Sequence, residues 1–330
     1  MKYINPKSSK KGDQLLKEVY QEIKSSLPGP IAPPYKIHSI DSKLLSIYWD
    51  INKFTYFSGD LSRTLKDVVA AGVSDANECP FCYESHTELL QFENKELKQA
   101  FRTKNLDLIK DPYTKKLAKY SLNIYNPNIL KNESLGYNQE DKTEIIGTVL
   151  MFTYTNILTN IFLYESVIPL PNRFGLRNLM WKMATPMMKK AFNIKLERVD
   201  KEEYNELPNT LEWADQDLLI GNSFNNLYEY LEKESSFLSD STKEIALQKI
   251  NSWNGESLGL QLNATIAQWL KECETKDKDV LNIIYKSCFA SYTMGEKDIN
   301  SFLSNHNESQ LLIVVSWSAA QICQRISSWL

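Results

Sequence analysis

The 330-residue sequence is poor in glycine and proline, with 11 and 12 residues respectively. A chain of many short strands needs frequent turns, and turns depend largely on these two residues. Their scarcity disfavours an all-β protein and favours helices. The sequence also lacks a large excess of charge of either sign, because its formal net charge at pH 7 is -3. Overall charge therefore provides no attraction to nucleic acid or to an anionic membrane, and we expect neither as a partner.

Cysteine is scarce as well, and its number, five, is odd. Cys273, Cys288 and Cys323 are widely scattered, which disfavours the disulfide framework of a small secreted protein. The N-terminal residues lead into no apolar run of the kind found in secretory signals. The sequence therefore predicts a cytoplasmic protein with reduced thiols, in which these three cysteines serve as packing residues.

Charged residues are absent from one long stretch, 145–164. A run of about 20 apolar residues can span a bilayer as a helix. This run also contains six threonine and asparagine residues, which are costly in lipid unless they find hydrogen-bond partners. We therefore expect a buried helix of a helical bundle rather than a membrane span.

Apolar residues recur with helical spacing over most of the chain. The pattern predicts helices over 14–25, from Ser42 onwards and over 61–76, the last of them capped by Ser62. The proline-rich strip at 27–34 breaks this pattern, and we expect it to run extended over a surface.

The next predicted helix begins with the most chemically distinctive motif of the chain. Cys79 and Cys82 are three apart and His86 follows four residues later, so the three side chains would form one column on a helix face. Asn77 is expected to cap this helix, with Pro80 in its first turn. The partial positive charge of a helix N-terminus favours a thiolate, and a nearby imidazole can accept the thiol proton. The motif therefore predicts redox chemistry.

The stretch 173–198 is basic and rich in methionine. Such a composition fits a helix that binds a membrane surface or a partner protein. It also fits a connector that packs on the bundle and leaves its lysines in solvent. We expect the connector, because Pro186 would interrupt the helix.

The second half of the chain shows an internal repeat of the first. From Leu238 onwards it aligns without gaps to the stretch that begins at Leu61, and each copy ends in an apolar helix. The second copy keeps the helical pattern and one acid but lacks the thiols and the imidazole, as the aligned pairs show: Asp67 with Glu244, Cys79 with Glu256, Cys82 with Gly259 and His86 with Asn263. We therefore predict four segments: an N-terminal arm with lead-in helices at 1–60, an active repeat at 61–165, a connector at 166–230 and a degenerate second repeat at 231–330.

The motif has four fixed residues, which are Asp67, Cys79, Cys82 and His86. Eleven residues separate the acid from the Cys-x-x-Cys pair, and three residues separate that pair from the histidine. This motif and its flanking residues resemble the carboxymuconolactone decarboxylase / alkylhydroperoxidase D-like superfamily. The resemblance is good over 30–165 and weaker over the second half. It implies an all-α helical bundle, here in tandem with a degenerate second copy, and association into a homo-oligomer, either a dimer or a trimer.

Members of this superfamily with both cysteines resemble thiol peroxidases, so the resemblance implies that activity here. Cys82 would attack a hydroperoxide as a thiolate and become a sulfenic acid, which Cys79 would convert to a disulfide. His86 would accept and return the proton, and an external dithiol would then reduce the disulfide. Neither a cofactor nor a metal is implied. The acid of the family is usually glutamate, and Asp67 is one methylene shorter, so we expect it to reach the site through water.

Other interpretations of the thiol pair stay open. A zinc site would need a fourth ligand beside Cys79, Cys82 and His86, and a thioredoxin-like fold would need a strand before the motif. A general dithiol-disulfide oxidoreductase on a helical scaffold is the main enzymatic alternative. A redox sensor or stress-linked binding protein is the non-enzymatic one, and buried thiols could also be inert. His38 and His306 are isolated, and we expect them at the surface or in satisfied packing roles.

Overall fold

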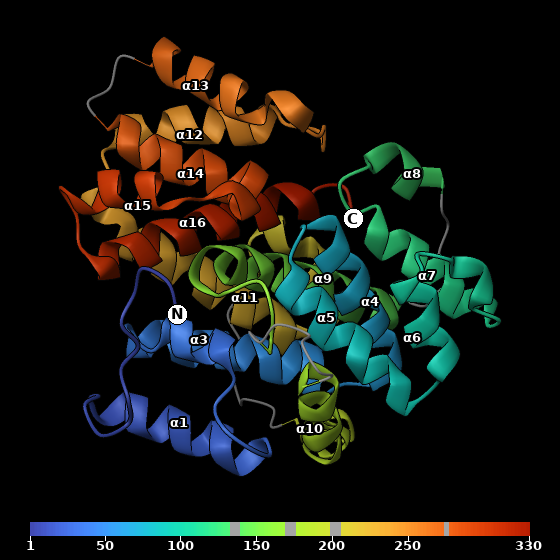
Figure 1. Cartoon of the computed structure of the whole chain (residues 1–330). Helices are drawn as coiled ribbons and strands as arrows, with labels where there is room; N and C mark the ends of the chain where they lie inside the picture. The colour runs from blue at the N-terminus through green and yellow to red at the C-terminus, as the bar shows by residue number, and fades with distance from the viewer. Residues whose placement is uncertain (133–138, 169–175, 199–205, 274–276) are drawn as a thin grey trace.

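The computed structural model describes residues 1–132, 139–168, 176–198, 206–273 and 277–330. Every secondary-structure element within these ranges is a helix and none of their residues forms a strand, which confirms the predicted all-α class (Figure 1). Short 3-10 turns and the π-helix η1 (Lys53–Phe57) lie between the α-helices. The α-helices are α1 (Gln14–Ser26), α2 (Pro33–His38), α3 (Ser42–Asn52), α4 (Arg63–Ala76), α5 (Pro80–Leu89), α6 (Lys95–Arg102), α7 (Pro112–Leu122), α8 (Pro127–Asn132), α9 (Gln139–Phe162), α10 (Leu176–Phe192), α11 (Leu218–Glu234), α12 (Asp240–Ser252), α13 (Leu262–Glu272), α14 (Lys278–Ala290), α15 (Glu296–Leu303) and α16 (Glu308–Ser327).

Helix α9 is the central helix of the molecule and packs against both α4 and α16 (Figure 1). Within the described ranges it is the one helix long and apolar enough to cross a membrane, but 94% of that apolar window is buried inside the protein. Two of its hydroxyls are satisfied along the helix itself, since Thr148 donates to the Glu144 carbonyl at 2.7 Å and Thr155 to the Met151 carbonyl at 2.8 Å. The stretch is therefore a core helix of the bundle, as expected.

Helix α4 packs on α5, α7 and α9 and forms the inner wall of the first half. Its start is fixed as predicted, because the Ser62 hydroxyl accepts a hydrogen bond from the Leu65 amide. The helix comes closest to α7 at Gly72, where an added Cβ would lie 2.0 Å from the Ser121 hydroxyl oxygen. A larger residue at Gly72 would push the two helices apart.

Helix α5 begins at Pro80 as predicted, but its N-cap is Cys79 and not Asn77. Asn77 ends α4 instead, because its side-chain amide donates back to the Val73 carbonyl at 2.8 Å. The chain then turns through Glu78, whose φ of 48° lies in the left-handed region. This short turn places Cys79 at the start of α5 and keeps α5 against α4.

The N-terminal segment packs on one side of this core (Figure 1). Helix α1 follows the prediction for 14–25 and packs on α3, whose start is capped by the Asp41 carboxylate. The proline-rich strip is only partly extended as expected. Pro33 begins α2, because a proline at the first helical position needs no partner for an amide.

Helices α11, α14 and α16 form much of the second half. Ser239 caps α12 as Ser62 caps α4, in keeping with the aligned repeats. Glu256 and Gly259, which align with the cysteines, lie outside any α-helix. Helix α11 crosses residue 231, and one apolar core joins the two halves. The division into four segments stays a prediction.

Helix α10 continues through Pro186, so the predicted interruption of the helix is wrong. A proline at this position cannot donate a hydrogen bond to the carbonyl four residues earlier, which is that of Lys182. Lys182 is exposed to solvent, and water can therefore satisfy this carbonyl. The helix lies at the lower side of the molecule and contacts α5 (Figure 1).

Candidate active site

Cys79 and Cys82 lie at the N-terminus of α5 and are buried, with 1% and 4% of their surfaces exposed. The Cys82 side chain is close enough to raise the pKa of Cys79. His86 follows one turn further along the same helix, and it lines a common cavity with Cys82. The structure thus places Cys82 and His86 on one cavity, whereas Cys79 is the N-cap of the helix and does not line that cavity.

The predicted acid reaches this column directly. Oδ1 of Asp67 lies 2.8 Å from Nδ1 of His86, so the expected contact through water is wrong. The shorter aspartate suffices because α4 packs tightly on α5 and the Asp67 side chain is fully buried between the helices. A carboxylate at Nδ1 selects the tautomer that carries its proton there and leaves Nε2 free as a base.

Two residues that the sequence did not single out hold Asp67 in place. Tyr56 of η1 donates its hydroxyl to Asp67 Oδ1 at 2.5 Å, and it accepts from Nη2 of Arg63 at 2.8 Å. Nε of Arg63 donates to Asp67 Oδ2 at 3.0 Å, and the guanidinium lies 3.9 Å from the centre of the Tyr56 ring. The four-residue spacing of Arg63 and Asp67 is a signal that the sequence contains, whereas nothing in the sequence marks Tyr56.

The Arg63 guanidinium decides the charge of the buried carboxyl. Burial alone would raise the pKa of Asp67, but Arg63, together with hydrogen bonds from His86 and Tyr56, holds that pKa below its usual value. Burial raises the pKa of Tyr56 well above its usual value, so Tyr56 acts as a neutral donor. His86 therefore faces an ionised carboxylate whose position is fixed by a cation and a phenol.

The Cys79 thiol does not behave as a helix N-terminus alone would predict. Burial raises the pKa of Cys79 well above its usual value, and hydrogen bonding with the Cys82 side chain raises it further. Both effects outweigh the partial positive charge of the helix end. Cys79 is therefore a neutral thiol, which suits the cysteine that completes a disulfide better than the one that attacks first.

The two cysteines line different cavities. Cys82 and His86 line one of about 480 Å³ with apolar and aromatic walls, which we call the Cys82 cavity. Its outer wall consists of the segment 27–34 and side chains of α10. Cys79 lines a second cavity of about 630 Å³ with many polar residues in its walls, among them Lys104. The two cysteines thus border cavities with different walls.

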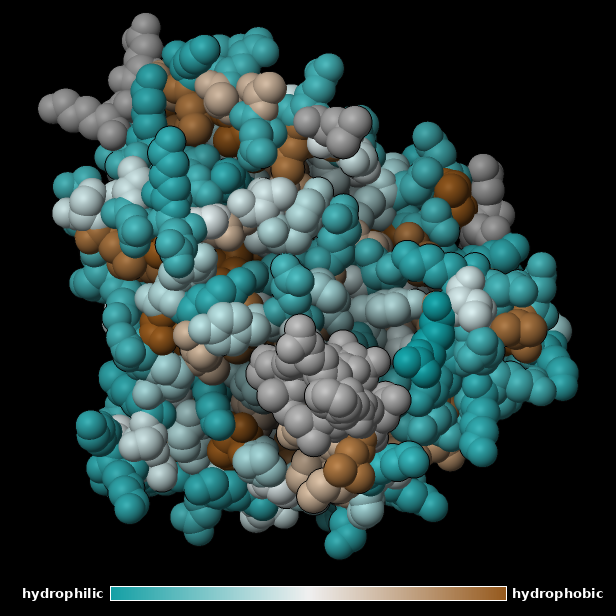
Figure 2. Space-filling view, viewed as in Figure 1, coloured by the Kyte–Doolittle hydropathy of each residue, from teal (hydrophilic) through white to brown (hydrophobic). Residues whose placement is uncertain are grey.

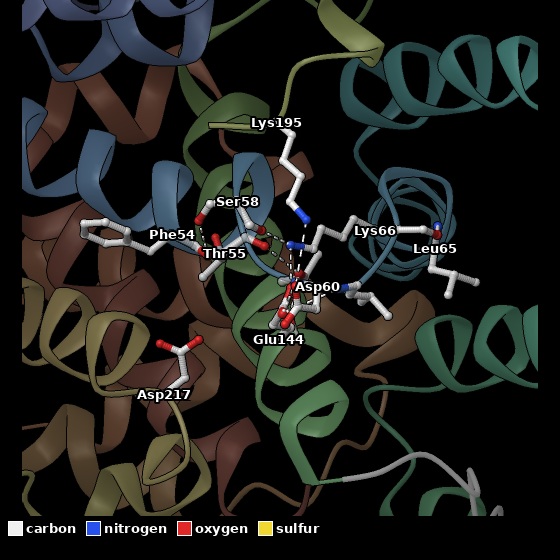
Figure 3. A network of polar contacts seen from close by, with 12 residues as sticks. Phe54, Thr55, Ser58, Asp60, Leu65, Lys66, Glu144, Lys195 and Asp217 are labelled. Atoms are coloured by element: carbon white, nitrogen blue, oxygen red, sulfur yellow. Dashed lines mark hydrogen bonds and ion pairs between the residues drawn. The ribbon is translucent and has the colours of Figure 1, made fainter. Parts of the chain in front are cut away.

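A buried ion pair fixes the loop that joins η1 to α4 (Figure 3). Nζ of Lys66 lies 2.6 Å from Oε2 of Glu144, and the two side chains are 1% and 6% exposed. Lys66 also donates to the Ser58 carbonyl. At Gly59 the loop has a φ of 90°, and an added Cβ would fall 2.3 Å from the Glu144 carboxylate. The ion pair therefore holds the loop that positions Tyr56.

The two other histidines have packing roles. His38 is buried, with Nδ1 2.8 Å from the Pro34 carbonyl and Nε2 3.1 Å from the Tyr154 hydroxyl. Burial lowers the pKa of His38 to about 4. His306 stacks on Phe302 with ring centres 4.3 Å apart. Both positions fit the satisfied packing role that the sequence predicts.

The remaining cysteines are buried and lie away from Cys82. Each thiol donates to a backbone carbonyl, at 3.1 Å for Cys273, 3.4 Å for Cys288 and 3.3 Å for Cys323. Burial raises the pKa of Cys288 and of Cys323. These features fit the predicted packing role.

The fold and the site together define an all-helical protein with a buried Cys-x-x-Cys pair and a histidine held by a carboxylate. The sequence is similar to that of an alkyl hydroperoxide reductase from Mycobacterium tuberculosis. The two are 21% identical over 350 residues, and the alignment covers 100% of this chain and 96% of the relative. No protein-family model matches the chain. The similarity is that of a distant homologue over the whole length.

Proposed function

We propose that this protein is a thiol peroxidase of the alkylhydroperoxidase D-like superfamily, with Cys82 as its nucleophile. One observation carries the proposal: Cys82 and His86 line the same cavity, and the carboxylate of Asp67 binds Nδ1 of His86 and leaves Nε2 for the proton of the reaction. The name of the distant relative supports the same function.

The first step forms a sulfenic acid on Cys82. The Cys82 thiolate attacks one oxygen of the hydroperoxide, the S–O bond forms and the O–O bond breaks. Nε2 of His86 takes the thiol proton and returns it to the leaving oxygen, which departs as an alcohol. Asp67 stabilises the imidazolium that exists between these transfers, while Arg63 and Tyr56 keep Asp67 ionised and in position.

The second step forms the disulfide. The Cys79 thiol attacks the sulfenic sulfur of Cys82, the S–S bond forms and the oxygen leaves as water. An external dithiol then supplies two electrons and two protons. We place its attack at Cys79, because Cys79 lines the second, more polar cavity, and Cys82 then leaves as the thiolate that begins the next cycle.

A general dithiol-disulfide oxidoreductase is the second candidate function. The observation that favours it is the same polar cavity at Cys79, which would admit a thiol or disulfide of another molecule. In that function the substrate would meet Cys79, and the Cys82 cavity would have no part in the reaction. A cytoplasmic location and association into a dimer or trimer stay predictions for either function.

Consumption of tert-butyl hydroperoxide with dithiothreitol as reductant tests the proposal. Wild type should turn over, Cys82→Ser should be inactive, and Cys79→Ser should turn over more slowly, because dithiothreitol must then reduce the Cys82 sulfenic acid directly. Cys273→Ser, which removes a thiol remote from the motif, should keep wild-type activity. Wild-type activity in Cys82→Ser would refute the assignment. A wild type that is oxidised once without turnover would indicate a sensor, and one that reduces only disulfides would indicate the oxidoreductase.

A further inference from the structure

Helix α10 carries a row of exposed apolar side chains. Leu179, Met183 and Met187 follow one another at intervals of four residues, with Met180 beside them, and these four side chains are 54%, 74%, 39% and 39% exposed in that order. Residues four apart share a helix face, so the four form one band, which we call the α10 stripe. Figure 2 shows hydrophobic side chains gathered at the lower edge of the molecule, where Figure 1 places α10. Exposed apolar bands of this kind mark interaction sites.

The charge of α10 itself is positive. Lys182, Lys189 and Lys190 of the same helix are all exposed. The sequence has six basic residues and no acidic residue between 166 and 196. Since the whole chain has a net charge of -3, the stretch 166–196 is a local concentration of positive charge that the overall value conceals.

The α10 stripe adjoins the Cys82 cavity. Met187 belongs both to the stripe and to the wall of the cavity. On the opposite side it packs on the proline-rich segment, where a Cβ added to Gly29 would lie 2.3 Å from the Met187 sulfur. The outer wall of the Cys82 cavity is thus formed where α10 meets 27–34. A surface bound to the stripe would lie against this wall.

An anionic membrane surface fits both properties of the stripe. The apolar side chains of such a helix enter the boundary of the acyl chains, and its lysines meet the headgroups. A second copy of this chain fits less well, because pairing two stripes would bring their lysines together. We propose that α10 docks the protein on an anionic membrane surface and that the Cys82 cavity takes its hydroperoxide from the lipid. The docking is independent of the proposed function, whereas the source of the substrate rests on it.

Flotation of the full-length protein with vesicles tests the docking. We expect binding to phosphatidylcholine vesicles with about 30% phosphatidylglycerol, and binding at least about tenfold weaker without the anionic lipid. Met183→Asp should weaken binding about tenfold or more, because it places a charge in the apolar band. Each of Lys182→Glu and Lys189→Glu should weaken it about fivefold or more. Matched controls are Phe237→Asp and Lys110→Glu, at positions exposed elsewhere on the protein, and both should bind as wild type does.

Several outcomes would overturn the docking: no binding, equal binding to both kinds of vesicle, or a dimer in light scattering that Met183→Asp dissociates. The source of the substrate is tested by comparing a phospholipid hydroperoxide in the same vesicles with tert-butyl hydroperoxide in solution. Met183→Asp should slow only the first reaction, about tenfold, in line with its loss of binding. Equal effects on both reactions would refute the lipid source. A wild type inactive on both would refute the proposed function and leave the vesicle binding as its own result.

Discussion

Oδ1 of Asp67 lies 2.8 Å from Nδ1 of His86, and the same oxygen accepts the hydroxyl of Tyr56. The three residues come from α4, α5 and η1, so the contact depends on how these elements pack. Arg63 completes the group as the cation that keeps the buried carboxyl ionised. Each of these side chains has a different part in holding the imidazole, and removal of each should therefore have a distinguishable effect.

Asp67→Asn should lower kcat/KM about 10²- to 10⁴-fold, because an amide cannot stabilise the imidazolium. It should also lower the free energy of unfolding by about 3–5 kcal/mol, since Arg63 would keep a buried charge without its partner. Asp67→Glu keeps a carboxylate and should be the more active of the two variants. Its extra methylene in a packed site should lower the free energy of unfolding by about 1–3 kcal/mol. The measurement is kcat/KM for a hydroperoxide on folded protein. Equal values for Asp67→Asn and Asp67→Glu would contradict the prediction.

Tyr56→Phe should lower kcat/KM about tenfold while the protein stays folded, because the phenol holds Asp67 in position. The variant also removes one of the hydrogen bonds that lower the pKa of Asp67. The acidic limb of the pH profile of kcat/KM should therefore move to higher pH. Tyr230→Phe is the matched control, because its hydroxyl also donates to a carboxylate, that of Asp41, and it lines neither the Cys82 cavity nor the Cys79 cavity. A uniform loss of activity at all pH values would show a merely structural role for Tyr56.

Arg63→Met should reverse the pH dependence that Asp67 gives to stability. In wild type the lowered pKa of Asp67 contributes stability above about pH 4, and this is lost as the pH falls through the lowered value. Without the guanidinium, burial should raise that pKa, so ionisation would cost stability as the pH rises. The difference between the urea midpoints of wild type and variant should therefore widen from about pH 4 to 7. A constant difference, as expected for the exposed control Arg102→Met, would contradict this.

Lys66→Met should lower the free energy of unfolding by about 3–5 kcal/mol, because it leaves the Glu144 carboxylate buried without its closest cation. Glu144→Gln should cost a similar amount for the opposite reason. The double variant should be more stable than the sum of the two losses implies, since neither buried charge remains. Urea unfolding of the four proteins gives the coupling energy, and additive losses would show that the pair does not act as a unit.

His38 should make the protein less stable in mild acid. Burial lowers its pKa from 6.5 to about 4, so the unfolded chain binds a proton between these values and the folded protein does not. Stability is therefore lost as the pH falls below about 6.5, by about 2 kcal/mol at pH 5. His38→Gln should remove most of this slope, and His306→Gln should leave it intact. Unfolding curves at pH 7 and pH 5 measure both, and an unchanged slope in His38→Gln would contradict the prediction.

Local sequence was sufficient to predict the helices and the order of the reactive side chains. The start of α4 follows from Ser62 and from apolar spacing, and Cys82 and His86 share a face because the residues between them are helical. Capping and proline rules gave wrong predictions at two positions where the local sequence allowed more than one structure. Asn77 was free to cap α5 but bonded back to α4, and Pro186 stayed within a helix because its turn faces water.

Only the tertiary structure decided which distant side chains meet at the motif. The direct contact of Asp67 with His86 depends on the distance between α4 and α5, and that distance is set by how the two helices pack on each other. Tyr56 joins the site from η1, which is followed by a loop that the buried ion pair of Lys66 with Glu144 of α9 holds. Helical periodicity and capping act between neighbours in the chain and can be read from it. Packing between distant segments determines three other features, and no local pattern contains them. These features are the approach of the helices, the separate cavities that Cys79 and Cys82 line, and the exposure of the α10 stripe.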